Sequence, residues 1–308
     1  MRKFGADVIV GIWTAFCIAC NPAWADDHCV LQQIAKLDMS ILRDGRVSVP
    51  MTVQGQQLNM LVDTGGLLSM LTPKTIGTLG LMRQSIPMSR ISQYGGLRID
   101  HFAEAHDISL GGLTARKFVF LEMPEGGHPQ DIDGLLAPDI MRNYDVEFDF
   151  AGAALKLMSP DHCEGNVVYW THDPFGSVEF TLNEAGQISV PIMLDGHEIH
   201  ATIDTGAYRS VVSLETIEDL FNIDEKNADL HLAPRATADR PVYRYPFKTL
   251  SVQSITVTNP DITLMPNSMS RLPPGAPKML LGINVLRQLH LYFAYHEHTL
   301  YVTPATAH

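Results

Sequence analysis

The sequence has few cysteines and no concentration of basic residues. Only four of its 308 residues are cysteine, the net charge is −12, and no run of Lys or Arg is longer than a pair. Because phosphate neutralisation supplies most of the affinity for nucleic acid, this composition argues against nucleic acid as a partner. A phosphate-cradling Gly loop, a dinucleotide fingerprint and the sequence context of a Ser-His-Asp triad are also absent.

The sequence also lacks an apolar run long enough to cross a bilayer. The apolar run near the N-terminus, from Val8 to Cys20, has 13 residues, whereas a spanning helix needs about 20. Arg2 and Lys3 precede this run, and the small-x-small segment Ala23-Trp24-Ala25 follows it. The pattern predicts a secretion signal over residues 1–25 that is removed on export to the periplasm or the medium, so no stable membrane insertion is expected. An uncleaved anchor and a lipid-modified Cys20 are the alternatives.

Removal of the signal takes Cys17 and Cys20 with it and leaves Cys29 and Cys163. Two thiols in an oxidising compartment predict one disulfide. Both cysteines end an Asp-His-Cys triplet, so a pair of metal ligands is the other interpretation. We assign no metal and no cofactor, because the histidine pairs His197/His200 and His296/His298 have no carboxylate or cysteine cluster to complete a set.

The chain contains an internal duplication. Residues 45–76 align without a gap with residues 186–217, and 11 of the 32 pairs are identical. A second ungapped block pairs residues 135–157 with residues 280–302. Repeats decide how later motifs are counted, so any motif in one copy should be sought at the equivalent place in the other.

Each copy shows the pattern of short strands joined by hairpins. Apolar and polar residues alternate, as in Val47-Ser48-Val49, and the runs break at glycines such as Gly55 and Gly196. Helical patterns are short and are confined to residues 137–144, 214–221 and 283–289. An all-β pair of domains follows, with 45% apolar residues to fill its cores.

Both copies carry an apolar strand that ends in Asp-Thr-Gly, at Asp63-Thr64-Gly65 and at Asp204-Thr205-Gly206. An apolar strand packed in a core holds a carboxylate rigidly, and Gly permits a sharp turn and a close backbone approach. The hydroxyls of Thr64 and Thr205 can donate and accept, so they can lock the two turns together. One such triplet is an ordinary turn signal; two at equivalent places in a duplication predict a shared carboxylate site. A serine follows each Asp by six positions, at Ser69 and Ser210.

With these motifs the sequence resembles the aspartic peptidases, combining the single two-lobed chain of pepsins with small lobes of the retroviral type. The resemblance implies two homologous β-barrel lobes related by a pseudo-twofold axis, with catalytic Asp63 and Asp204 activating a water for hydrolysis of a peptide bond. It implies an endopeptidase that acts as a monomer on peptide or protein substrates. The expected divisions are a first lobe over residues 26–158, a linker over 159–174 and a second lobe over 175–308.

The first lobe departs from the family pattern at two positions. Leu280-Leu281-Gly282 matches the family's apolar-apolar-Gly segment, but the first copy has Leu135-Leu136-Ala137, and Gly66 stands where Ser or Ala is usual. We expect the turn to survive, because Ala exceeds Gly by one methyl group. Residues Tyr94-Gly95-Gly96 are the expected tip of a flap hairpin over the substrate, and residues 231–245 are its counterpart in the second lobe.

Two other functions fit the same residues. A catalytically inactive peptide-binding or scaffolding module would keep the fold and use Asp63 and Asp204 only to stabilise turns. A glycosidase would use them as acid and nucleophile, about 5 to 9.5 Å apart. The distance between the carboxyl groups discriminates these readings, since a peptidase needs them within hydrogen-bond reach.

Overall fold

The computed structural model describes residues 30–305, except 87–91, 95–96, 126–130, 185, 225, 235, 237–240 and 267–277. The predicted signal over residues 1–25 and the predicted disulfide partner Cys29 lie outside the described residues, as do Gly95 and Gly96 of the predicted flap. Within the described ranges, no helix is long and apolar enough to span a membrane.

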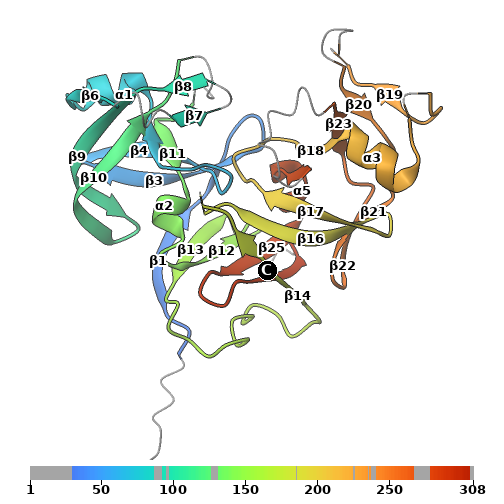
Figure 1. Cartoon of the computed structure of the whole chain (residues 1–308). Coiled ribbons are helices and arrows are strands. Elements are labelled where there is room, and N and C mark those ends of the chain that lie inside the picture. Colours follow the sequence, from blue (N-terminus) through green and yellow to red (C-terminus); the bar gives the residue numbers. More distant parts are fainter. Residues whose placement is uncertain are drawn as a thin grey trace, which may run out of the picture.

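The first half of the chain forms a closed barrel (Figure 1). Its sheet runs in the order β2-β3-β4-β11-β5-β10-β9-β6, and an additional pairing of β3 with β9 joins the two ends of a six-stranded ring. A separate hairpin pairs β7 (Ser92–Tyr94) with β8 (Leu97–Ile99). The strands of the sheet are β2 (Ser40–Ile41), β3 (Val47–Val53), β4 (Gln56–Val62), β5 (Met70–Leu71), β6 (Arg83–Ser85), β9 (His101–Leu110), β10 (Leu113–Glu122) and β11 (Gly134–Leu136).

The second half repeats this plan but stays open. Its sheet runs in the order β19-β20-β23-β18-β24-β17-β16-β21-β22, and β15 pairs with β16. The strands are β15 (Thr181–Leu182), β16 (Ile188–Leu194), β17 (His197–Ile203), β18 (Ser210–Ser213), β19 (His231–Leu232), β20 (Tyr243–Arg244), β21 (Thr249–Val252), β22 (Ile255–Thr258), β23 (Ile262–Met265) and β24 (Met279–Leu281).

A single break accounts for the difference. In the first lobe β10 is continuous and pairs with both β9 and β5. In the second lobe its place is shared by β22, which pairs with β21, and β23, which pairs with β18. Asn259 (φ 47°) and Pro260 separate these two strands. Because Pro donates no hydrogen bond and φ > 0 leaves the extended region, the ladder cannot run through this point.

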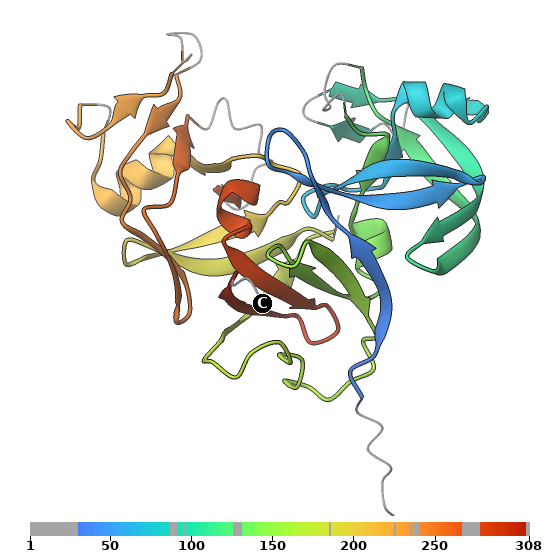
Figure 2. The same ribbon diagram turned by 180° about the vertical axis from the view of Figure 1, so that it is seen from behind.

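A six-stranded sheet joins the two lobes. It runs in the order β1-β13-β12-β25-β26-β14, so both halves of the chain contribute three strands. Figure 2 shows its strands from behind, with β1 at the edge. The central contact is the antiparallel pair of β12 with β25. The strands are β1 (Gln33–Asp38), β12 (Asp145–Asp149), β13 (Ala154–Met158), β14 (Gly176–Glu179), β25 (Leu289–Ala294) and β26 (Thr299–Pro304).

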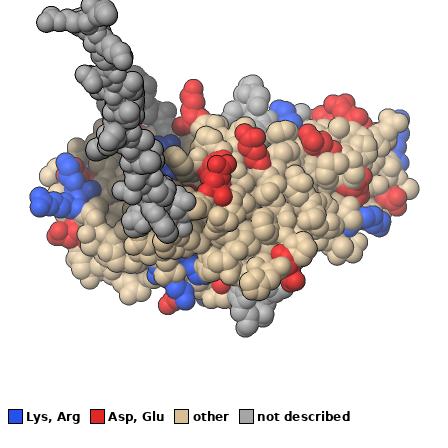
Figure 3. All heavy atoms as spheres, turned by 90° about the horizontal axis from the view of Figure 1, so that it is seen from below, with Lys and Arg blue, Asp and Glu red and all other residues tan. Residues whose placement is uncertain are grey.

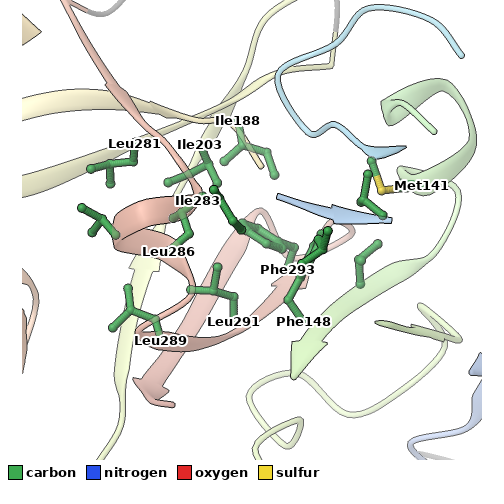
Figure 4. Close-up of a cluster of buried hydrophobic side chains, with 14 of the residues drawn as sticks. Met141, Phe148, Ile188, Ile203, Leu281, Ile283, Leu286, Leu289, Leu291 and Phe293 are labelled. Atoms are coloured by element: carbon green, nitrogen blue, oxygen red, sulfur yellow. The ribbon is translucent and has the colours of Figure 1, made fainter. Parts of the chain in front are cut away.

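Strands β12 and β25 are buried along their whole length, because both faces of this sheet are covered. On one face a core continuous with both lobes includes Met141 and Phe148 from the first half and Ile203, Leu281 and Phe293 from the second (Figure 4). On the other face lies the segment 159–175. This segment has no helix or strand, and it packs Val167 and Trp170 against the sheet.

Four short helices complete the described part of the chain. The prediction over residues 214–221 is confirmed by α3 (Leu214–Phe221), which Ser213 caps by accepting a hydrogen bond from the Thr216 amide. The predictions over 137–144 and 283–289 were too long, since only α2 (Pro138–Met141) and α5 (Ile283–Leu286) are helical. Helix α1 (Pro73–Thr78) was not predicted, although Thr72 followed by Pro73 is a cap and first-turn signal.

The acidic composition is visible on the surface. On the face drawn in Figure 3, Asp and Glu side chains are spread among uncharged residues, and Lys and Arg do not gather into a continuous basic area.

Candidate active site

Two equivalent strands carry Asp63 and Asp204 to the junction of the lobes. Each aspartate follows the last residue of its strand, β4 or β17, which pairs in parallel with β11 or β24. The last hydrogen bond of each parallel strand pair is made by the aspartate itself. The Asp63 amide donates to the Leu136 carbonyl and the Asp204 amide donates to the Leu281 carbonyl, both at 2.9 Å. Because Val62 and Ile203, the last residues of these strands, are buried, the carboxylates start from fixed backbone positions.

The glycines of both triplets face the opposite carboxyl group. A Cβ atom placed on Gly65 would overlap the carboxyl group of Asp204, and one placed on Gly206 would overlap that of Asp63. Only glycine therefore allows each turn to approach the other lobe's aspartate this closely.

The two threonines join the turns in the way that the sequence predicted. The Thr64 amide donates to Thr205 Oγ1 (3.1 Å), and the Thr205 amide donates to Thr64 Oγ1 (3.0 Å). The Thr64 hydroxyl donates to the Ile203 carbonyl (2.9 Å), and the Thr205 hydroxyl donates to the Val62 carbonyl (2.8 Å). Both side chains are buried. At about 1 kcal/mol for each hydrogen bond, these contacts fix the relative position of the turns.

The carboxyl groups of Asp63 and Asp204 are in contact. A side-chain hydrogen bond joins them, and Asp63 is only 5% exposed. Burial first, and then the neighbouring charge of Asp204, raises the pKa of Asp63 well above its usual range. Burial also raises the pKa of Asp204. Two like charges this close in a buried site cannot both ionise easily, so the pair holds one proton over a wide pH range.

Backbone amides stabilise the charge that remains. The Gly65 amide donates to Asp63 Oδ1 at 3.1 Å, and the Ala207 amide donates to Asp204 Oδ1 at 2.9 Å. The arrangement could therefore supply a general base and a general acid side by side, held by the ends of two strands.

A polar contact in each lobe supports the loop that follows the turn. Ser69 accepts a hydrogen bond from the Ala137 amide (3.1 Å) and donates to Asp139 (2.7 Å). Ser210 accepts from the Gly282 amide and donates to Asn284, both at 3.0 Å. Sequence reasoning noted the two serines but missed their partners. The alignment of residues 135–157 with residues 280–302 places Asp139 opposite Asn284. This equivalence could have identified the two residues as the partners of the serines.

The two departures of the first lobe compensate each other. Gly66 in the first lobe corresponds to Ala207 in the second, and Ala137 in the first corresponds to Gly282 in the second. Each lobe therefore has one Gly and one Ala at these two positions, in opposite order. A Cβ on Gly66 would lie 3.3 Å from the Ala137 Cβ, which is a tight contact. A Cβ on Gly282 would lie 2.5 Å from backbone atoms of Arg209 and 2.8 Å from the Ala207 carbonyl oxygen, so the backbone alone excludes a side chain there. In each lobe only one of the two positions has room for a methyl group.

One further pair of contacts at the turns was missed by sequence reasoning. Arg46 Nη1 donates to the Gly206 carbonyl at 2.9 Å, and Gln187 Nε2 donates to the Gly65 carbonyl. These donors occupy equivalent positions, immediately before β3 and β16, in the first aligned block. The alignment of the two copies shows that Arg46 and Gln187 are equivalent, but nothing in the sequence indicates that their side chains cross between the lobes.

The flap residues are only partly described. Strands β7 and β8 form a hairpin in which Tyr94 pairs with Leu97, and the predicted tip residues Gly95 and Gly96 between them lie outside the described residues. In the second lobe, residues 231–245 contribute the strand pair β19–β20. The role of both segments over the substrate stays a prediction.

The predicted disulfide also stays a prediction, because Cys163 is described and Cys29 is not. The histidine pairs that sequence reasoning set aside form no metal cluster within the described ranges. A group that could hold a metal ion lies elsewhere, at Glu147, Asp149 and His290 in the six-stranded sheet. Both oxygens of Glu147 already accept hydrogen bonds, from Lys156 (2.7 Å) and Tyr169 (2.6 Å), so this group is a satisfied polar network.

Two related β lobes that bring a pair of aspartates together at equivalent turns are the arrangement expected of the aspartic peptidase family. The family model described as aspartyl protease matches residues 49–139, and that of the gag-polyprotein putative aspartyl protease matches residues 190–288. The chain belongs to the aspartic peptidase family, and its predicted two-lobed all-β fold is confirmed.

A solved structure extends the likeness to nearly the whole chain. The crystal structure of basic 7S globulin from soybean is 12% identical and superimposes with a TM-score of 0.52, covering 90% of this chain and 96% of that chain. At this identity the likeness shows the fold alone. Among the curated proteins, no sequence matches the chain significantly.

Proposed function

We propose that this protein is an exported aspartic endopeptidase in which Asp63 and Asp204 together activate a water molecule for attack on a peptide bond. The observation that carries the proposal is the hydrogen-bonded carboxyl pair at the junction of two equivalent turns. A turn-stabilising role would not require each Gly to be pressed against the opposite carboxyl group.

The chemistry follows from the shared proton. The ionised carboxylate takes a proton from the bound water, and the protonated partner donates its proton to the carbonyl oxygen of the scissile bond. The backbone amides of Gly65 and Ala207 hold the carboxyl oxygens in place for both steps. Proton sharing of this kind is the established chemistry of aspartic peptidases, and it favours activity at acidic to mildly acidic pH.

The substrate is a peptide in extended conformation, bound between the lobes and beneath the flap segments. An extended chain can pair its backbone with strand edges, so main-chain contacts provide affinity and side-chain pockets provide selectivity. The hairpin β7–β8 supplies such an edge, because its two strands pair only with each other in the described part of the chain. The enzyme acts as a monomer, since one chain already supplies both aspartates.

Hydrolysis of a diverse peptide library between pH 3 and pH 7 tests the activity. Asp63→Asn and Asp204→Asn should each lower kcat/KM by roughly 10² to 10⁴-fold, because each removes one of the two proton-transfer groups. Asp38→Asn is the matched control, because Asp38 is exposed on β1, and it should leave the rate unchanged. A folded wild-type protein that binds peptides but cleaves none would establish the inactive binding module instead.

Export is tested separately. Expression of the full chain in a bacterial host should yield a periplasmic protein whose N-terminus, read by mass spectrometry, is Asp26. A product that keeps residues 1–25 and stays in the membrane fraction would favour the anchor.

A further inference from the structure

Arg46 and Gln187 make an unequal contact between otherwise equivalent turns. Both side chains cross to the opposite lobe and donate to the carbonyl of the Gly in the Asp-Thr-Gly triplet, at Gly206 and Gly65 respectively. The strands and the threonine contacts have counterparts in the other lobe, and the amides of the equivalent pairs Gly65–Gly66 and Gly206–Ala207 act on the two carboxyl groups. The difference at this position is charge, because Arg is permanently cationic and Gln is neutral.

The cation is held firmly. The Arg46 side chain is 14% exposed, and its guanidinium also donates to Asp44 Oδ2, from Nε at 2.9 Å and from Nη2 at 2.6 Å. Asp44 accepts from the Arg46 amide as well, at 3.1 Å. The planar fork is thus fixed by one carboxylate, while its remaining nitrogen points at the turn that carries Asp204.

The cation acts on a pair that would otherwise share its proton evenly. Two carboxyl groups in identical surroundings each hold the shared proton half of the time, and a nearby positive charge favours the ionised form of the nearer group. Burial raises the pKa of both carboxyl groups. The charge of Arg46 is among the influences that lower the pKa of Asp204, whereas the groups that lower the pKa of Asp63 are the amides of Gly65 and Gly66.

We propose that Arg46 is a positioning residue that breaks the symmetry of the pair, so that the proton rests on Asp63 and the negative charge on Asp204. Given the peptidase activity proposed above, Asp204 is then the general base that activates water, and Asp63 is the general acid that protonates the scissile carbonyl. The duplication supplied two equal carboxylates, and one substitution at an equivalent position assigns them different roles.

Exchange of the donors tests this assignment. Arg46→Gln gives both lobes the neutral donor, Gln187→Arg gives both the cation, and the double variant Arg46→Gln/Gln187→Arg moves the cation to the first lobe. The carboxyl carbons of the purified protein, labelled with ¹³C in aspartate, are followed by NMR from pH 3 to pH 8, and the Asp63→Asn and Asp204→Asn variants assign the two signals.

In the wild type the Asp204 signal should titrate at the lower pH. In Arg46→Gln it should move upward by roughly half a pH unit or more, toward that of Asp63, and in the double variant the order should reverse. Arg46→Lys, which keeps a cation, should retain most of the wild-type separation. Asp44→Asn removes the counter-charge and should lower the pH at which Asp204 titrates.

A purely structural role gives a different result. It predicts that Arg46→Gln lowers the melting temperature while the order and separation of the two titrations stay unchanged, and that outcome would overturn the assignment. Because the NMR titration needs no turnover, it also separates this inference from the proposed function. A wild type that cleaves no peptide would refute the peptidase, and the two carboxyl signals would still report whether Arg46 orders them.

Discussion

At the scale of single residues, the active-site turns show how a duplicated site tolerates substitution. Gly66 and Ala137 depart from the family pattern, and the structure explains them as a compensated pair, because Ala207 and Gly282 place the methyl group at the other position of the second lobe. The motif itself was readable from the sequence. The compensation was not, since it depends on the distance between two loops that are far apart in the chain.

The exchange predicts a coupled pair of substitutions. Gly66→Ala should destabilise the protein by about 1 kcal/mol, because the new methyl group lies 3.2 Å from the Asp63 carboxyl carbon and 3.3 Å from the Ala137 Cβ. In Gly66→Ala/Ala137→Gly, which reproduces the second lobe, stability and activity should largely return. Urea denaturation of the two single variants and the double variant measures the coupling.

Gly77→Ala is the matched control. Gly77 lies in α1, and a Cβ atom at this position would have nothing within 4 Å, so this change should be neutral or stabilising by up to about 1 kcal/mol. Strictly additive effects of Gly66→Ala and Ala137→Gly would contradict the explanation.

At the scale of elements, the repeat and the alternation of apolar residues predicted the strands and two small lobes, and both lobes are found. The closed and the half-open barrel could not be distinguished in advance, although Asn259 and Pro260 mark the break. The six-stranded sheet between the lobes was also missed. Its β12–β25 pairing joins residues about 145 positions apart, and local periodicity carries no information on such pairings.

The segment 159–175 is better described as a cover over this sheet than as a free linker. Trp170 stacks on His290 with ring centroids 4.2 Å apart and an interplanar angle of 5°, and its Nε1 donates to Thr303 Oγ1 at 3.0 Å. Nε2 of His162, in the same segment, lies 2.5 Å from Asp145 Oδ2, within hydrogen-bond distance. The contacts anchor the segment at two places.

Loss of the stacked ring should therefore loosen the segment. Trp170→Ala should lower the free energy of unfolding by about 2 kcal/mol, less than the roughly 3 to 5 kcal/mol of a fully buried aromatic side chain because Trp170 is partly buried, and should make residues 159–175 the first site of cleavage by added protease. Trp170→Phe keeps a ring over His290 and should retain most of the stability. Equal protease resistance of Trp170→Ala and the wild type would show that the cover does not depend on this stack.

At the scale of the whole molecule, stability should follow the titration of buried groups in two directions. Burial of His162 lowers its pKa, but the hydrogen bond to Asp145, the contact with the Cys163 carbonyl and the charges of Asp145 and Glu297 together outweigh burial and raise the pKa above 6.5. Its contribution is thus complete below pH 6.5 and is lost as the pH rises through the folded-state value. The raised pKa values of Asp63 and Asp204 act in the same direction, because the folded protein holds their proton more tightly than the unfolded chain does.

Glu147 acts in the opposite direction. Burial raises its pKa, but hydrogen bonds from His290, Lys156 and Tyr169 outweigh burial and place the pKa below 4.5. Its contribution is complete above pH 4.5 and is lost as the pH falls through the folded-state value. The contributions of His162 and Glu147 are both complete between about pH 4.5 and pH 6.5, whereas those of Asp63 and Asp204 decline from about pH 3.8 upward. Stability should therefore be highest in the mildly acidic range and fall toward alkaline pH.

Melting temperatures measured from pH 3.5 to pH 8.5 test this expectation. The wild type should melt highest in the mildly acidic range, His162→Gln should flatten the decline on the alkaline side, and Glu147→Gln should flatten the decline on the acidic side. Asp63→Asn should raise the melting temperature at pH 8 relative to the wild type, because it removes the repulsion of two like charges while it abolishes cleavage. A wild-type maximum at pH 8 would mean that these buried networks do not control stability, and the Asp63→Asn comparison would then show whether the carboxyl pair itself carries any of the pH dependence.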